Sequence, residues 1–177
     1  WPGGNSIRAA QEIFPATRDR LGGRNPVFSL TPSPGNVDIM VASELIEAGR
    51  AMQNGYVSPE RTTLIASTHR IYATIEKMQM ADGRFDSSRV VDAGRQLAKQ
   101  AILFDMRKLA EDSGTVINAV LFGAMAGSGV LPLPRNSCEQ AIRGGGRGAE
   151  ASLRGFASGF DIAAGKHLKS VTGLHKP

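Results

Sequence analysis

The stretch IMVASELIEAGRAMQ (residues 39–53) decides the fold, because it joins a short apolar run directly to a helical pattern. Its first part, IMVA (residues 39–42), has no polar residue and indicates a strand that is buried on both faces. Ser43 follows and predicts the N-cap of a helix. Glu44 and Glu47 then place negative charge in the first turn, where the helix dipole favours it. The segment therefore predicts a strand that leads straight into an amphipathic helix.

A second strand follows the helix predicted over residues 44–53. The apolar run TTLIA (residues 62–66) has the length of a buried strand. Strand, capped helix and strand within ~30 residues make a βαβ unit, which requires parallel strands and a right-handed crossover. A third short strand is predicted at AILF (residues 101–104), after a helix that begins at Asp86 or Ser87. The apolar face predicted for that helix comprises Val90, Val91, Gly94, Leu97, Ala98 and Ala101.

The C-terminal half of the chain is predicted to be helical. Helices are expected over residues 106–112, 116–126, 136–143 and 149–164, and the second of these is apolar nearly all round and hence internal. A short strand candidate at residues 27–30 precedes the first βαβ unit. We expect an α/β fold of Rossmann-like, three-layer α/β/α type, with a mostly parallel sheet and a helical C-terminal part. Residues 1–165 would form the domain and residues 166–177 a tail or linker.

Composition excludes several classes of protein. The 177 residues fit one domain, and the single cysteine, Cys138, cannot form an internal disulfide. The formal charge is +5, but the basic residues are scattered and no stretch interleaves them with aromatic residues. We therefore expect no nucleic-acid binding. The longest apolar stretch falls short of the roughly 20 residues that span a bilayer, so we expect no membrane segment and a cytoplasmic protein.

Polar side chains follow the predicted strands, where open parallel sheets bind ligands. Ser43 and Glu44 follow the first strand and Asp105 the third. The second strand has the richest set, because two hydroxyls, an imidazole and a guanidinium suit a phosphate, a carboxylate or a 2-oxoacid. These residues are Ser67, Thr68, His69 and Arg70. The alternative is structural: the hydroxyls would satisfy turn backbone groups, and the guanidinium would pair with a neighbouring carboxylate.

Other candidate residues have strong structural alternatives. Asp105 at the start of a helix is first of all a cap. Asn118, inside an apolar helix, is expected either to bond a partner chain or to be buried and satisfied within its own domain. Cys138 is expected to be a small buried hydrophobe and not a reactive thiol.

The search for metal and phosphate motifs finds little. The three histidines, His69, His167 and His175, are far apart in the sequence and no Cys-x-x-Cys is present. The GSG of residues 127–129 is expected to end a helix. The segment RGGGR (residues 143–147) resembles a phosphate loop in composition, but three glycines between two helices also mark a hinge. We expect no metal site and no iron–sulfur cluster in this chain.

Three segments resemble one protein family. They are VDIMVASELIEAGR (residues 37–50), RTTLIASTHRIY (residues 61–72) with Glu76 and Lys77, and INAVLFGAMAGSGVLP (residues 117–132). Together they closely resemble the gamma-type domain of indolepyruvate ferredoxin oxidoreductase beta subunits, and the likeness runs from about Glu12 to Phe160 with few gaps.

The resemblance implies a non-thiamine subunit or domain of a ferredoxin-dependent oxidoreductase that decarboxylates aryl 2-oxoacids oxidatively to acyl-coenzyme A. Thiamine diphosphate, magnesium and the iron–sulfur clusters would lie on a thiamine-bearing alpha-type partner subunit or on other domains, with none bound by this chain. Electrons would pass to ferredoxin through the complex, and a homodimer is possible. The residues expected on the substrate or coenzyme A side are Glu44, Ser67, Thr68, His69, Arg70 and Asn118.

The chain departs from this family at its beginning. Family members start with a strand and a glycine-rich turn, and they carry a Pro-Gly-x-Ala-Gln-Arg-type segment before the position of Ile13. Neither feature is present in this sequence. We therefore expect that the N-terminal portion of the domain is missing. The alternative function is a stand-alone Rossmann-like module that binds a small molecule or a nucleotide.

Overall fold

The computed structural model describes residues 11–13, 18–27, 31–69 and 87–165 of the chain. Within them, β1 (Ile39–Ala42), β2 (Thr63–Ser67) and β3 (Gln100–Phe104) form a three-stranded sheet in the order β1-β2-β3. Both pairs of neighbouring strands are parallel. The expected parallel sheet is confirmed, with its three carboxyl ends along one edge.

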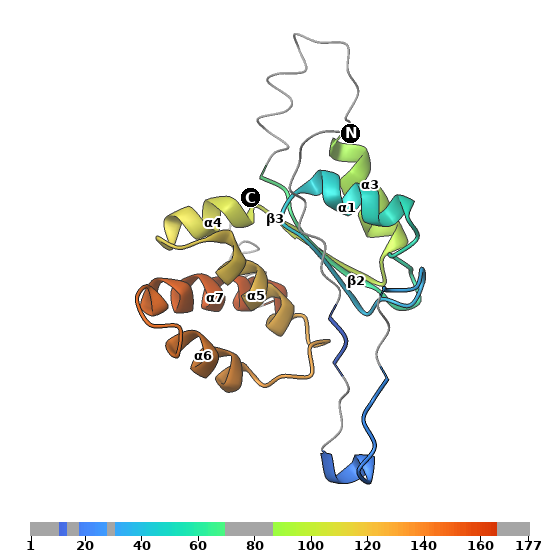
Figure 1. Ribbon diagram of the computed structural model, residues 1–177. Coiled ribbons are helices and arrows are strands. Elements are labelled where there is room, and N and C mark those ends of the chain that lie inside the picture. Colours follow the sequence, from blue (N-terminus) through green and yellow to red (C-terminus); the bar gives the residue numbers. More distant parts are fainter. Residues whose placement is uncertain (1–10, 14–17, 28–30, 70–86, 166–177) are drawn as a thin grey trace, which may run out of the picture.

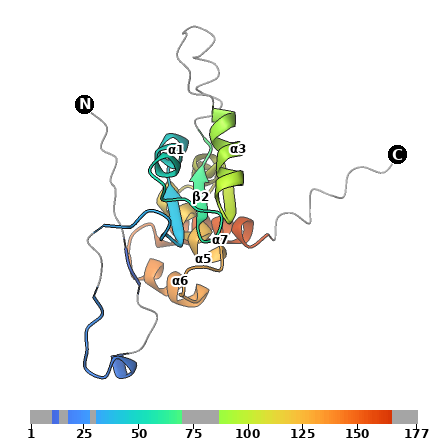
Figure 2. The same ribbon diagram turned by 90° about the vertical axis from the view of Figure 1, so that its right-hand side faces the viewer.

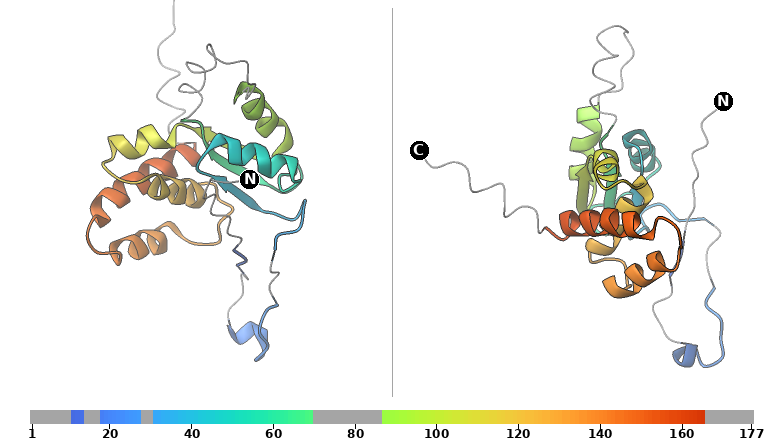
Figure 3. Two further views of the ribbon diagram at one scale, coloured as in Figure 1. Left: turned by 45° about the horizontal axis from the view of Figure 1, so that its top comes forward. Right: turned by 90° about the vertical axis from the view of Figure 1, so that its left-hand side faces the viewer.

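Helices cover both faces of the sheet (Figure 1). One layer consists of α1 (Leu45–Gln53) and α3 (Ser87–Leu97), which lie side by side (Figure 2). The other face carries α4 (Met106–Asp112) and α5 (Ile117–Gly127). α6 (Arg135–Arg143) and α7 (Ala149–Ala163) lie beyond α5, with α6 away from α1 and α3 (Figure 3). A short 3-10 turn, η1 (Arg18–Leu21), precedes the sheet. The α/β fold with a helical C-terminal part is confirmed.

β2 forms the centre of the core because both of its faces are covered. Leu64 and Ala66 pack into a cluster with α1 and with Ala98, just after α3. Ile65 packs instead against Met106 of α4 and Val120 of α5. All the residues of this strand are buried. An apolar run without alternation is what a strand between two helical layers requires.

α5 and α7 approach each other unusually closely through glycines. A Cβ atom added at Gly123 of α5 would overlap the carbonyl oxygen of Phe156, and one added at Gly159 of α7 would overlap that of Val120. At the other end of the contact, a Cβ at Gly155 would lie 2.5 Å from Cγ2 of Thr115. The two helices therefore pack backbone against backbone, and α7 fixes the loop that leads into α5.

Three local predictions need correction. The N-cap of α1 is Glu44 and not Ser43, and no side-chain hydrogen bond caps this helix. Leu97, predicted on the buried face of α3, is 43% exposed because it lies in the last turn, just before the chain enters β3. Val27 is 97% exposed and not in a strand, while the other residues of that candidate, 28–30, lie outside the described residues. The tail predicted at 166–177 also lies outside them.

None of the helices in the described ranges combines the length and the apolar character that a membrane crossing needs.

Candidate functional site

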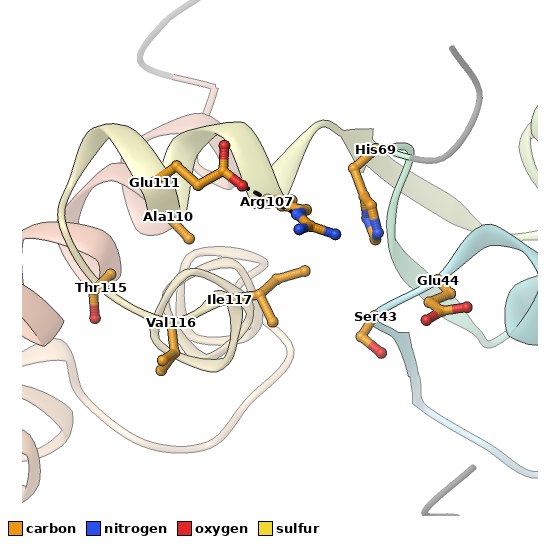
Figure 4. Close-up of a pocket in the computed structure, with 9 residues that line it drawn as sticks. All are labelled: Ser43, Glu44, His69, Arg107, Ala110, Glu111, Thr115, Val116 and Ile117. Atoms are coloured by element: carbon orange, nitrogen blue, oxygen red, sulfur yellow. Dashed lines mark hydrogen bonds and ion pairs between the residues drawn. The ribbon is translucent and has the colours of Figure 1, made fainter. Parts of the chain in front are cut away.

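A cleft of about 380 Å³ opens at the edge of the sheet where the strands end (Figure 4). Residues following β1 and β2 form one wall, and α4 with the loop into α5 forms the other. The lining residues are Ser43, Glu44, His69, Arg107, Ala110, Glu111, Thr115, Val116 and Ile117. The cleft lies where open parallel sheets bind ligands.

Ser67 connects the end of β2 to this cleft. Its side chain is fully buried, and its hydroxyl oxygen accepts a hydrogen bond from the backbone N–H of Met106 at 3.2 Å. The same oxygen lies 3.0 Å from Nδ1 of His69, whose ring lines the cleft. The backbone N–H of Thr68 donates to the carbonyl oxygen of Phe104 at 3.0 Å, which extends the β2–β3 pairing. Ser67 thus lies buried beneath the cleft, in contact with His69.

α4 contributes an ion pair to the opposite wall. Nε of Arg107 lies 3.0 Å from Oε1 of Glu111, one helical turn later, and both side chains are more than half exposed. The guanidinium points toward the His69 side of the cleft (Figure 4). Asp105 accepts a hydrogen bond from the backbone N–H of Lys108 at 2.9 Å. Its interpretation as a helix cap is confirmed.

The structure brings together some of the predicted site residues. Glu44 and His69 line the cleft, and Ser67 is hydrogen-bonded to His69. Thr68 is adjacent but does not line it. Arg70 lies outside the described residues.

Asn118 is exposed, so the interpretation as a buried amide satisfied within the domain is wrong. The reason is that Asn118 lies in the first turn of α5, before the helix enters the core. Its suggested bond to a partner chain stays a prediction.

Sequence reasoning missed Arg107 and Glu111. The signal was present, because these residues follow the third strand end and lie four apart on a helix, which puts them on one face. The apolar side of the cleft was missed too. Val116 and Ile117 start α5, and only the fold of the C-terminal helices brings that start back to the sheet edge.

The lining has a polar side and an apolar side. His69 and Arg107 supply nitrogen atoms that can donate to an anionic oxygen, although Glu111 competes for the guanidinium. Ala110, Val116 and Ile117 supply apolar surface. A ligand with a carboxylate or phosphate and an apolar part would match both sides.

Among the described residues, neither Cys138 nor the acidic side chains form a second reactive or metal-binding site. Cys138 is 2% exposed, and its burial raises the pKa of the thiol, which disfavours the thiolate. It packs as the predicted small hydrophobe. Over the ranges that the structure describes, no group of three or more His, Cys, Asp or Glu side chains is placed to hold a metal ion.

The glycine segments also lie outside the cleft lining. α5 ends at Gly127, and the hydroxyl of Ser128 donates to the carbonyl oxygen of Met125 at 2.7 Å, so the predicted helix stop is confirmed. Residues 144–148 connect α6 to α7, and Gly146 and Gly148 have positive φ angles in this turn. Both interpretations of this segment, as a hinge and as a phosphate loop, stay predictions.

Comparison with known families gives one match. The family model described as pyruvate ferredoxin/flavodoxin oxidoreductase matches residues 18–162, which include the whole sheet and the helices from α1 to nearly the end of α7. No curated protein and no solved structure matches. Because the match covers most of the chain and every element around the cleft, the chain belongs to the pyruvate ferredoxin/flavodoxin oxidoreductase family, as a gamma-type domain.

Proposed function

We propose that this chain is the non-thiamine part of an indolepyruvate-type ferredoxin oxidoreductase, which converts an aryl 2-oxoacid and coenzyme A to acyl-coenzyme A and carbon dioxide. Two electrons pass to ferredoxin in each turnover. The observation that carries the proposal is the family match over residues 18–162. Membership in this family implies work within a multi-subunit complex, which we place in the cytoplasm.

The residues of this chain that could ligate a metal or a cluster support the assignment of the cofactors to a partner subunit. An iron–sulfur cluster is held by several thiolates, commonly four, and this sequence has a single cysteine, which is buried. Magnesium takes oxygen ligands, and no three His, Cys, Asp or Glu side chains of the described residues are grouped to hold a metal ion. Neither group finds a ligand set among the residues that the structure describes. The proposal therefore assigns the clusters, magnesium and thiamine diphosphate to the partner subunit, and thiamine diphosphate supplies the decarboxylation chemistry there.

The role left to this chain is to bind and orient a substrate. In the proposal, Arg107 and His69 bind the anionic oxygens of the 2-oxoacid or of coenzyme A. Val116, which is 64% exposed, and Ile117 offer a surface for the apolar part. An aromatic side chain would bury more apolar area there than a methyl group would, and buried area favours binding at about 25 cal/mol per Å². This supports aryl 2-oxoacids over pyruvate.

The proposal is tested by substrate preference in the complete complex. We expect a higher kcat/KM with indolepyruvate than with pyruvate, measured as coenzyme A-dependent reduction of ferredoxin. Replacing Val116 with Ser should lower the ratio of the two values, whereas Val130→Ser on the loop after α5 should not. Equal kcat/KM values for both substrates would refute the aryl specificity. Tight binding of a nucleotide to the chain without its partner would instead favour a stand-alone binding module.

A further inference from the structure

Ser67 makes hydrogen bonds to two different parts of the site. It is the last residue of β2, and its side chain is 0% exposed. Its hydroxyl oxygen lies 3.2 Å from the backbone nitrogen of Met106 and 3.0 Å from Nδ1 of His69. One buried hydroxyl therefore connects the central strand, the first residue of α4 and a ring that lines the cleft.

The protons of this arrangement can be assigned by elimination. The backbone N–H of Met106 can only donate, so the hydroxyl oxygen accepts there. The hydroxyl proton then has Nδ1 of His69 as its acceptor. If Nδ1 carried a proton instead, the oxygen would accept twice, and its own proton would be buried with no acceptor among the described residues. A buried unsatisfied donor is costly, so the first arrangement is favoured.

We propose that Ser67 is a positioning residue that holds neutral His69 as the tautomer with its proton on Nε2. The ring then presents a hydrogen-bond donor on the side away from Ser67, instead of a basic nitrogen. Its role would be to bind an anionic oxygen and not to abstract a proton. Identifying that oxygen with a 2-oxoacid carboxylate or a coenzyme A phosphate rests on the proposed function.

Nitrogen NMR of the full chain tests this directly, because long-range proton–nitrogen spectra report which ring nitrogen carries the proton. The chain has three histidines, so the His69 signals are assigned by their loss in His69→Gln. At a pH where the ring is neutral, we expect a single Nε2–H tautomer for His69. An Nδ1–H tautomer, or an equal mixture, would overturn the proposal.

Variants at Ser67 separate positioning from a merely structural role. Ser67→Ala should lower the fraction of the Nε2–H tautomer, whereas Ser67→Thr keeps the hydroxyl and should keep the tautomer. Ser128→Ala is a matched control, because it removes a serine hydroxyl hydrogen bond at the far end of α5. It should leave the His69 tautomer unchanged. A single Nε2–H tautomer in Ser67→Ala would contradict the inference. If Ser67→Ala fails to fold, the tautomer of His69 in the wild type and in Ser67→Thr still tests the proposal.

Activity of the complete complex gives an independent test. His69→Ala should lower kcat/KM by roughly tenfold to a hundredfold, because this is the loss expected when one hydrogen bond to a charged group is removed. Ser67→Ala should lower it less, and the double variant should lose less than the sum of the two single losses, because Ser67 acts through that ring as well as through the backbone N–H of Met106. Additive losses would overturn the proposal. The spectra need no partner, so an unexpected tautomer would refute this inference alone, whereas an inactive wild-type complex would refute only the proposed function.

Discussion

Gly123 of α5 lies so close to Phe156 of α7 that any side chain at position 123 would overlap the Phe156 carbonyl oxygen. The relationship is reciprocal, because Gly159 of α7 lies equally close to the backbone of Val120. Two helices can pack in this way only where both surfaces lack a Cβ atom. The contact holds the start of α5, and with it Thr115, Val116 and Ile117, at the cleft.

Gly123→Ala should therefore destabilise the fold. Backbone must move to admit the methyl group, and overpacking of this kind costs about 1–3 kcal/mol. The free energy of unfolding in urea measures the loss. Gly49→Ala is the matched control, because an added Cβ in α1 would meet Val90 at an ordinary 3.6 Å. That substitution should be neutral or stabilising by up to about 1 kcal/mol. Equal effects of the two substitutions would contradict the packing described for α5 and α7.

Thr62→Val should remove a hydrogen-bonded anchor just before β2. The hydroxyl donates to the carbonyl oxygen of Val37 at 2.8 Å and accepts from the backbone N–H of Ser58 at 3.0 Å, and the side chain is 0% exposed. Leaving these groups unpaired should cost about 1–3 kcal/mol in unfolding free energy. Thr115→Val loses only a 3.4 Å contact with the Ser152 hydroxyl, so it should cost less than about 1 kcal/mol. A smaller loss at Thr62 than at Thr115 would refute this ranking.

Much of the fold could be predicted from periodicity and turn residues alone. The apolar runs that became β1, β2 and β3 lie between two layers of helices, and β2, which is buried throughout, shows how burial on both faces leaves a strong sequence signal. The glycine contacts of α5 and α7 could not be predicted, because Gly123 and Gly127 are required only where the backbone of a second helix comes close, and the sequence does not show which helix that is. The prediction that Ser43 caps α1 was wrong, because the cap lies where the backbone turns into the helix. Sequence patterns locate that turn only to within a residue or two.

The site was predicted only in part, for a reason of topology. Residues that directly follow a buried strand, such as Glu44 and His69, can be placed at the sheet edge from the sequence. Arg107 and Glu111 follow the third strand end and could have been found in the same way, whereas Val116 comes from a loop whose return to that edge depends on three-dimensional packing. Asn118 was misplaced because its helix is apolar on average, although its first turn is exposed.

The stability of α6 and α7 should depend on pH through Glu139. The Arg135 guanidinium, 2.8 Å away, holds the pKa of this carboxyl below its ordinary value of 4.5, with a further contribution from Arg143. Because the folded pKa is lowered, the stabilisation is present above the unfolded value and is lost as pH falls through the folded one. Wild type should melt above Glu139→Gln at about pH 7, and the two should converge at about pH 3. A Tm difference that stays constant between these values would contradict this linkage.

Cys138 should react slowly with thiol reagents in the native state. The side chain is 2% exposed, and burial raises the pKa of its thiol, so little thiolate reaches solvent. We expect labelling by an aromatic disulfide to be slow in buffer and to speed up sharply in denaturant, followed by absorbance. Labelling at equal rates in both conditions would show that Cys138 is accessible in the folded protein.

Reconstitution tests the central claim, that this chain completes an oxidoreductase whose redox and thiamine chemistry lies elsewhere. The measurement is the rate of ferredoxin reduction with an aryl 2-oxoacid and coenzyme A, for this chain, its thiamine-bearing partner and the two combined. We expect coenzyme A-dependent turnover only in the combination, with the chain alone at background. Full activity of this chain without the partner would contradict the account.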